Sequence, residues 1–182
     1  MSDVNEELVR RYFELKGYFV RTNVRYEFRT EGGMGYSDID LCVLHPLSGD
    51  AAIVEVKGWH TERITPSYLR EHPRLFYFVR PEALAGARAL LGRDNFRRIL
   101  VLSRLGVRTP GREAVTAYAH ERGVEILEMP EVLRFLIELT PTGRSAGSES
   151  EHVIRLMKIY GLADIDESDP TQSSAEGFSD GP

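Results

Sequence analysis

The stretch AAIVEVKGW, residues 51–59, constrains the fold of this chain more than any other. Its first six residues are typical of a buried strand, except that the fifth is Glu55. Successive side chains of a strand alternate between its two faces, so Glu55 and Lys57 are predicted to share a face with Ile53. The opposite face takes three apolar residues, Ala52, Val54 and Val56. Burying a carboxylate and an amine is costly unless they pair or bind a metal ion. The sequence therefore predicts a charged site at the end of a core strand.

The order of helical and extended patterns predicts the fold class. An amphipathic helix is expected at Ser2–Lys16 and a strand at Tyr18–Thr30, and a loop with three glycines leads to a strand at Ser37–His45. Because only the turn 46–50 separates that strand from the next, the two are predicted to form a hairpin. Later elements are expected at 66–79, 81–91 and 112–121 (helical), at 97–103 and 124–128 (extended) and at 131–139 (helical). Alternating helices and strands imply crossovers and parallel pairing. We expect an α/β fold with a mixed β-sheet and helices on both faces.

The domain organisation follows from length and local composition. We expect residues 1–139 to form one domain, because 182 residues suit a single core. Residues 140–150 are rich in Gly, Ser, Thr and Pro, a composition that is typical of a linker. Residues 151–163 predict a short amphipathic helix, whose apolar face must pack on the domain, a second subunit or a partner. Residues 164–182 are acidic and poor in apolar residues, and we expect them to be disordered.

Composition narrows the class of protein. The single cysteine, Cys42, excludes an internal disulfide and a cysteine-ligated zinc or iron–sulfur site within the chain. No apolar run approaches the roughly 20 residues of a membrane helix, and the N-terminus is polar, so we expect a cytoplasmic protein that does not contact a membrane. The net charge is −5, but six acids and no Lys or Arg follow Ala163. Residues 1–163 thus carry 23 basic and 22 acidic groups, a balance that leaves nucleic acid open as a partner.

Asp40 is predicted to join Glu55 from the preceding strand. Alternation places Asp38, Asp40 and Cys42 on one face of that strand and Ile39, Leu41 and Val43 on the other. In a hairpin Asp40 approaches Glu55, and two close carboxylates repel unless one takes up a proton or a cation lies between them. Such oxygen ligands suit Mg²⁺ or Mn²⁺, and the Val56 carbonyl is a further candidate ligand. Lys57 would then orient or deprotonate a metal-bound water.

Asp40, followed beyond a turn by Glu55-Val56-Lys57, resembles the signature of the PD-(D/E)XK nuclease superfamily. The resemblance covers roughly residues 3–60 and is greatest to archaeal Holliday-junction resolvases and related small bacterial proteins. The stretches that carry it are EELVRRYFELKGYFV, SDIDLCVL and AIVEVKGW. Two later stretches, RRILVLS and VEILE, are similar to the second half of Mrr-type domains. The segment after Lys57, the C-terminal helix and the tail depart from the minimal resolvases. The resemblance implies a restriction-endonuclease-like core.

The same resemblance implies a catalytic set of four residues, Glu6, Asp40, Glu55 and Lys57. Glu6 enters the set because those families carry a helix glutamate eleven residues before the glycine that follows the helix, which here is Gly17. The implied metal ligands are Asp40, Glu55 and Val56.

Alternatives remain for two members of this set. With Asp3 as the N-cap, Glu6 occupies the capping-box position and would serve only the start of the helix. In that case Glu7, on an adjacent helical face, is the fallback. Asp38 is the alternative to Asp40 as a ligand.

Other residues are open to two interpretations. Arg21, Arg25 and Arg29 recur every four residues, which in a regular strand places them on one face. They would form either a phosphate track or an ordinary solvated face. Trp59 and His60 would either contact a nucleic acid or pack against the domain.

The leading functional hypothesis is an endonuclease that hydrolyses DNA phosphodiesters with Mg²⁺ or Mn²⁺. A homodimer is a further expectation, because two cuts need two sites, and the C-terminal helix is a candidate docking element for a protein partner. The second hypothesis is a non-catalytic module on the same fold that binds nucleic acid or protein. The third is an RNA-processing nuclease.

Overall fold

A single mixed β-sheet forms the centre of the molecule. The structure, a computed structural model, describes residues 3–30, 32–58, 64–103, 109–140, 142 and 149–162. The five strands lie in sequence order, and their bounds are β1 (Phe19–Thr30), β2 (Gly33–Leu44), β3 (Ala51–Lys57), β4 (Arg97–Leu102) and β5 (Glu125–Glu128). The pairs β1–β2 and β2–β3 are antiparallel, whereas β3–β4 and β4–β5 are parallel. The predicted hairpin and the mixed sheet are confirmed.

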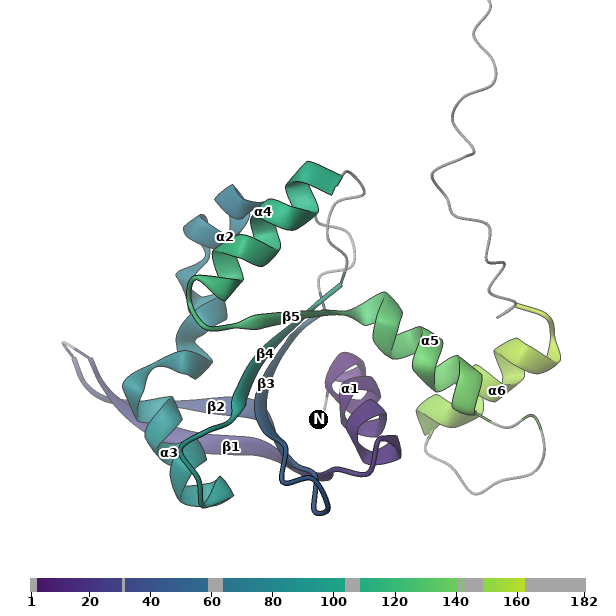
Figure 1. Ribbon diagram of the computed structural model, residues 1–182, viewed down its shortest axis with the longest axis horizontal. Helices are drawn as coiled ribbons and strands as arrows, with labels where there is room; N and C mark the ends of the chain where they lie inside the picture. Colours follow the sequence, from purple (N-terminus) through teal and green to yellow (C-terminus); the bar gives the residue numbers. More distant parts are fainter. Residues whose placement is uncertain are drawn as a thin grey trace, which may run out of the picture.

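Helices cover both faces of the sheet, as predicted (Figure 1). One face carries α1 (Val4–Leu15) and α5 (Met129–Leu139). The other carries α2 (Pro66–Glu71), the 3₁₀ helix η1 (Pro73–Val79), α3 (Pro81–Leu91) and α4 (Thr109–His120). The last described helix, α6 (Glu149–Ile159), packs on α5 and α1.

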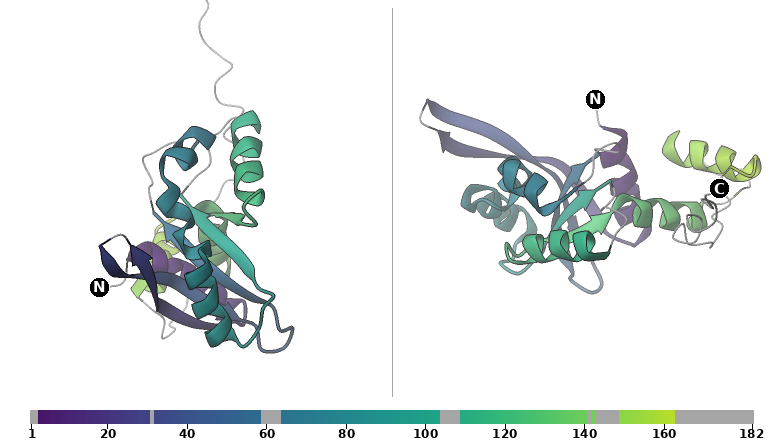
Figure 2. Two further views of the ribbon diagram at one scale, coloured as in Figure 1. Left: turned by 90° about the vertical axis from the view of Figure 1, so that its left-hand side faces the viewer. Right: turned by 90° about the horizontal axis from the view of Figure 1, so that it is seen from above.

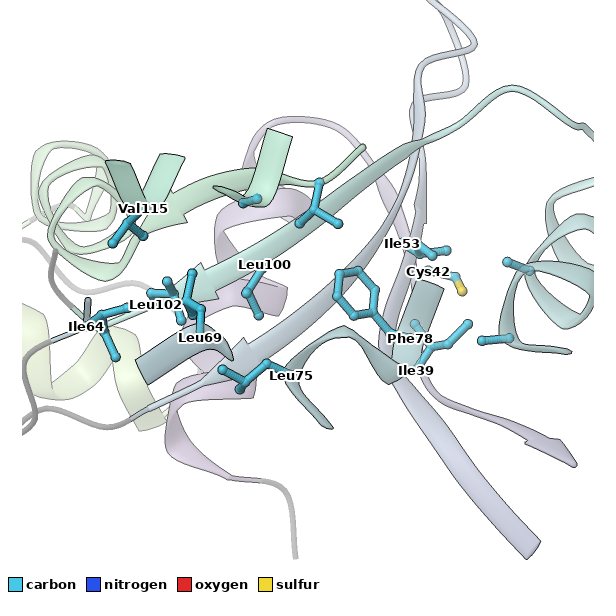
Figure 3. Close-up of a cluster of buried hydrophobic side chains, with 14 of the residues drawn as sticks. Ile39, Cys42, Ile53, Ile64, Leu69, Leu75, Phe78, Leu100, Leu102 and Val115 are labelled. Carbon is cyan, nitrogen blue, oxygen red and sulfur yellow. The ribbon is translucent and has the colours of Figure 1, made fainter. Parts of the chain in front are cut away.

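The sheet separates two apolar cores, and strand alternation decides which residue enters which. We call them the α3-side core, which includes Ile53, Leu75, Phe78 and Leu100, and the α1-side core, which includes Val9, Val54, Val56 and Leu136. Figure 3 shows Ile53 and Phe78 in the α3-side core. Along β3, Ile53 belongs to one core and Val54 to the other. The predicted alternation of β3 is thereby confirmed, and it places Glu55 and Lys57 on the α3 side.

The start and end of α1 follow sequence signals. The Asp3 side chain accepts a hydrogen bond from the Asn5 N–H (3.0 Å), as an N-cap does. After the helix, Gly17 has a φ of +88°, in the left-handed region that glycine adopts without a steric penalty. Helix α1 therefore has both ends that the sequence predicts, and its N-terminal end carries Glu6.

Several element boundaries differ from the predictions. Strand β2 begins at Gly33, so the glycine-rich segment is mostly extended rather than a loop. The predicted helical segment 66–79 consists of α2 and η1, separated by His72. A helix is present near 151–163, but it spans Glu149–Ile159. Most of the linker, the acidic tail 164–182, and Trp59 and His60 lie outside the described residues. Within the described parts of the chain, every helix is too short or too polar to cross a bilayer.

The β1–β2 hairpin changes faces part of the way along its length. On β1, Val20 packs with the α1-side core, whereas Val24 packs with the α3-side core, together with Tyr26 and Phe28. On β2, Leu41 lies in the α1-side core and Ile39 in the α3-side core. Residues an even number apart share a face only in a regular strand. The prediction that Ile39 and Leu41 share a face is therefore wrong, because the backbone is irregular between them.

This irregularity also separates the three arginines that were predicted to share a face. Arg25 and Arg29 alternate with Tyr26 and Phe28, so they point away from the α3-side core. Arg21 lies directly opposite Cys42 of that core, and residues directly opposite across an antiparallel pair share a face. The prediction that the three arginines share one face is therefore wrong. Beyond the irregularity, the hairpin extends away from the rest of the sheet (Figure 2).

Candidate active site

Glu55 and Lys57 form an ion pair at the end of β3. Lys57 Nζ lies 2.7 Å from Glu55 Oε1. Glu55 is only 7% exposed, so its charge is largely removed from water. Its second oxygen, Oε2, is buried and accepts no hydrogen bond. A buried acceptor without a partner costs about 1–3 kcal/mol. Glu55 Oε2 is one of four buried polar side-chain atoms without a partner among the described residues, and the only carboxylate oxygen of the four.

Asp40 approaches the same place from β2. The Val56 N–H donates a hydrogen bond to Asp40 Oδ2 at 2.7 Å. Burial raises the pKa of Asp40, and the bond from Val56 and the charge of Lys57 partly offset that rise. Burial, followed by the charge of Asp40, raises the pKa of Glu55 to about 7. The two predicted carboxylates therefore interact across β2 and β3.

Glu6 reaches the site from α1. Burial raises the pKa of Glu6, and the neighbouring charges of Asp40 and Asp3 raise it further, while Lys57 lowers it. Burial alone would lower the pKa of Lys57, but Glu55, Asp40 and Glu6 together raise it above its ordinary value. All four predicted residues thus share one electrostatic environment, although they come from three elements.

At the N-terminal end of α1, the Asn5 side chain lies close to Gly58, which follows the end of β3. A Cβ at Gly58 would lie 2.0 Å from Asn5 Nδ2, far inside van der Waals contact. Only a glycine leaves room for the Asn5 side chain here. Gly58 was expected to end the strand, but its contact with Asn5 had no sequence signal, because it joins residues more than fifty positions apart.

The capping-box alternative for Glu6 is not realised. Asp3 caps the helix through the Asn5 N–H, and among the hydrogen bonds of the described residues none runs from Asp3 N–H back to the Glu6 carboxylate. The fallback, Glu7, instead binds Arg10 (2.6 and 2.8 Å), and this side-chain hydrogen bond lowers the pKa of Glu7. Glu7 therefore forms an ion pair with Arg10 within α1.

Asp38, the alternative to Asp40, has a different position. It is exposed, lies opposite Arg25 in the β1–β2 ladder, and lines the cavity described next. Its charge contributes to the raised pKa of Asp40.

A cavity of about 790 Å³ opens beside the four residues. Glu6, Glu55 and Lys57 line it, whereas Asp40 does not and contacts the site through Val56. The opposite wall comes from η1 and the end of α2, with Arg74 and Tyr77 among its residues. The sequence predicted a helical segment there, but nothing in its pattern predicted that it would face Glu55. The cavity joins a charged wall to a wall of aromatic, apolar and basic side chains.

Among the described residues, no group of three or more His, Cys, Asp or Glu side chains forms a preassembled metal cluster. The predicted ligand set is not a group of this type, because it consists of two carboxylates and a backbone carbonyl. The unpartnered Glu55 oxygen is the feature that fits such a ligand set.

The chain shows little similarity to known proteins. No family model matches the chain, and no curated protein matches it. Among solved structures, the chain is similar to one in the EndoMS–dsDNA2 complex, with a TM-score of 0.34 and 15% sequence identity. The match covers 67% of this chain and 42% of that one, so this chain spans less than half the length of its structural neighbour. The interpretation of the site therefore rests on the residues of this chain.

Proposed function

We propose that this chain is a Mg²⁺- or Mn²⁺-dependent endonuclease with a restriction-endonuclease-like fold that hydrolyses DNA phosphodiesters. The observation that carries the proposal is the buried, unpartnered Glu55 Oε2 beside Asp40, Glu6 and Lys57. A structural ion pair would satisfy both oxygens of a buried carboxylate, since leaving one unpaired is costly. A carboxylate oxygen that has no hydrogen-bond partner and lies near other carboxylates is available to coordinate a cation.

The donor set fits a hard divalent cation. Asp40 and Glu55 would supply carboxylate oxygens, which Mg²⁺ and Mn²⁺ prefer. The Val56 N–H points toward β2, where it donates to Asp40. In an extended strand the N–H and C=O of one residue point to the same edge, so the Val56 carbonyl is directed toward β2 as well. When bound, such a cation would supply Lewis acidity toward a phosphoryl oxygen.

The other residues of the site would act on the water and the phosphate. The raised pKa of Lys57 keeps its amine protonated near neutral pH. This favours donation of a hydrogen bond to the attacking water or to a phosphate oxygen over removal of a proton. Glu6, at the cavity wall, would orient a water or hold a second cation. Arg74, across the cavity, would contact the phosphate backbone.

A substrate panel tests the proposal. Duplex, branched and single-stranded DNA and matched RNA are incubated with the protein and Mg²⁺ or Mn²⁺. We expect DNA cleavage that falls at least about 100-fold in Lys57→Ala and Glu55→Gln, because each removes a group that acts on the transition state. Lys16→Ala and Glu138→Gln, at exposed positions away from the cavity, serve as matched controls and should cut like the wild type.

Three outcomes would contradict the proposal. Undiminished cleavage by Lys57→Ala would assign the activity to another site or to a contaminant. Cleavage of RNA alone would support the RNA-processing hypothesis. Binding of nucleic acid without cleavage, combined with no Mn²⁺ affinity, would support the non-catalytic module.

A further inference from the structure

Asn23, on β1, has an unusual backbone conformation directly opposite Asp40. Its φ is +52°, and it is the one non-glycine residue with a positive φ among those the structure describes. Asparagine adopts this left-handed conformation more readily than other residues apart from glycine. Left-handed backbone inside a twelve-residue strand needs an explanation.

The sheet is interrupted on both sides of Asp40. In the β1–β2 ladder, Thr22 pairs with Leu41 and Val24 with Ile39, but Asn23 and Asp40 between them do not pair. On β2, the β2–β3 ladder starts at Leu41, the residue after Asp40, so Asp40 has no ladder partner on β3 either. The register is the same before and after Asn23, so no residue has been inserted and the disturbance is confined to this position.

The interruption coincides with the point where the hairpin changes faces. Val20 and Val24, on either side of Asn23, lie against different cores. Ile39 and Leu41, on either side of Asp40, do so as well. In a regular strand, successive side chains alternate between the two faces. A left-handed residue breaks this alternation, so the residues beyond it point to the opposite face from the one that regular backbone would give them. Asp40 therefore lies at the reversal, and its carboxylate accepts a hydrogen bond from the Val56 N–H.

We infer that Asn23 is a positioning residue for the proposed reaction. Its left-handed backbone holds β1 away from Asp40 and so leaves the Asp40 carboxylate directed at Val56 and the cavity end of β3. With an extended backbone at position 23, the Asn23–Asp40 pairing would form and would draw the carboxylate away from Val56. The importance of this placement for catalysis rests on the proposed function, but the placement itself does not.

The test compares Asn23→Gly, which keeps the left-handed conformation accessible, with Asn23→Val, which disfavours it. The readout is the Val56 amide in ¹⁵N–¹H spectra of the metal-free protein, because its proton reports the bond to Asp40. We expect Asn23→Gly to retain the wild-type shift and slow exchange. Asn23→Val should shift this proton upfield and speed its exchange at least tenfold. The matched control is Glu27→Val, at an exposed β1 position that pairs regularly with Tyr36.

An unchanged Val56 amide in Asn23→Val would overturn the inference, and so would an equal change in Asn23→Gly. If Asn23→Val does not fold, Asn23→Ala carries the same comparison, since alanine also disfavours a positive φ. Cleavage assays on the folded variants should show a lower kcat in the valine variant and recovery with glycine. If the wild type cuts no substrate, the proposed function fails, while the Val56 amide still decides the role of Asn23.

Discussion

At the residue scale, the site is defined by the environment of Glu55. Glu and Lys two positions apart on a strand are common on protein surfaces, where such pairs contribute little to stability. Here the carboxylate is buried, one of its oxygens has no partner, and Asp40 and Glu6 add like charge. These conditions raise the pKa of Glu55 to about 7, so without a cation its carboxyl takes up a proton more readily than an ordinary glutamate does.

The raised pKa of Glu55 predicts how stability depends on pH in the metal-free protein. An acid whose pKa rises from 4.5 to about 7 on folding stabilises the folded state fully below pH 4.5. This contribution is lost as the pH rises through 7, and it amounts to about 2–3 kcal/mol. Chemical denaturation between pH 4.5 and 8 with a chelator should therefore show the wild type losing stability relative to Glu55→Gln. The Glu138→Gln control should follow the wild type, and parallel curves for the wild type and Glu55→Gln would refute the predicted shift.

At the element scale, the site depends on how three elements meet. Helix α1 brings Glu6, β2 brings Asp40, and β3 brings Glu55 and Lys57. Asn5 lies close to Gly58 at the first of these junctions, and the bond from Val56 to Asp40 joins β3 to β2 at the second. Small shifts of α1 relative to β3 should therefore affect the site before they affect the core.

Gly58→Ala tests the junction of α1 with β3. The added Cβ would overlap the Asn5 side chain, so we expect a loss of about 1–2 kcal/mol in unfolding free energy, as overpacking usually costs. The double variant Asn5→Ala/Gly58→Ala should recover most of this loss, which a double-mutant cycle measures. Gly111→Ala, on α4 with open space at its Cβ, should not be destabilised. Additive losses in the double variant would show that the two residues do not constrain each other.

At the scale of the whole molecule, the cores on both faces of the sheet support the site. The α1-side core holds α1, α5 and α6 in place, and α6 buries Ile154 there. Four other apolar residues of α6 remain exposed, Val153, Leu156, Met157 and Ile159. The α3-side core supports η1, which forms the far wall of the cavity. The site lies where the two cores end, at the C-terminal end of the central strand β3.

A cation bound at this end of β3 should stabilise the entire fold. Binding to the folded state alone adds about 2.7 kcal/mol at a cation concentration 100 times Kd. We therefore expect Mn²⁺ to raise the thermal unfolding midpoint of the wild type at pH 8, and to raise it less at pH 5.5, where protons compete for Glu55. Glu55→Gln should lose most of this shift, and Glu138→Gln should keep it. An equal rise in all three proteins would indicate non-specific binding.

The sequence by itself determined the mixed sheet, the alternation of β3 and the N-cap of α1, because local periodicity and capping chemistry dictate these features. It also pointed to Glu6, Asp40, Glu55 and Lys57, partly through a family resemblance. Only the tertiary structure decided that Glu6 faces the cavity, that η1 closes it, and that the hairpin reverses its faces at Asn23. The physical reason is that these features depend on contacts between distant segments. A single left-handed residue leaves no periodic signal, yet it changes the face of every residue beyond it.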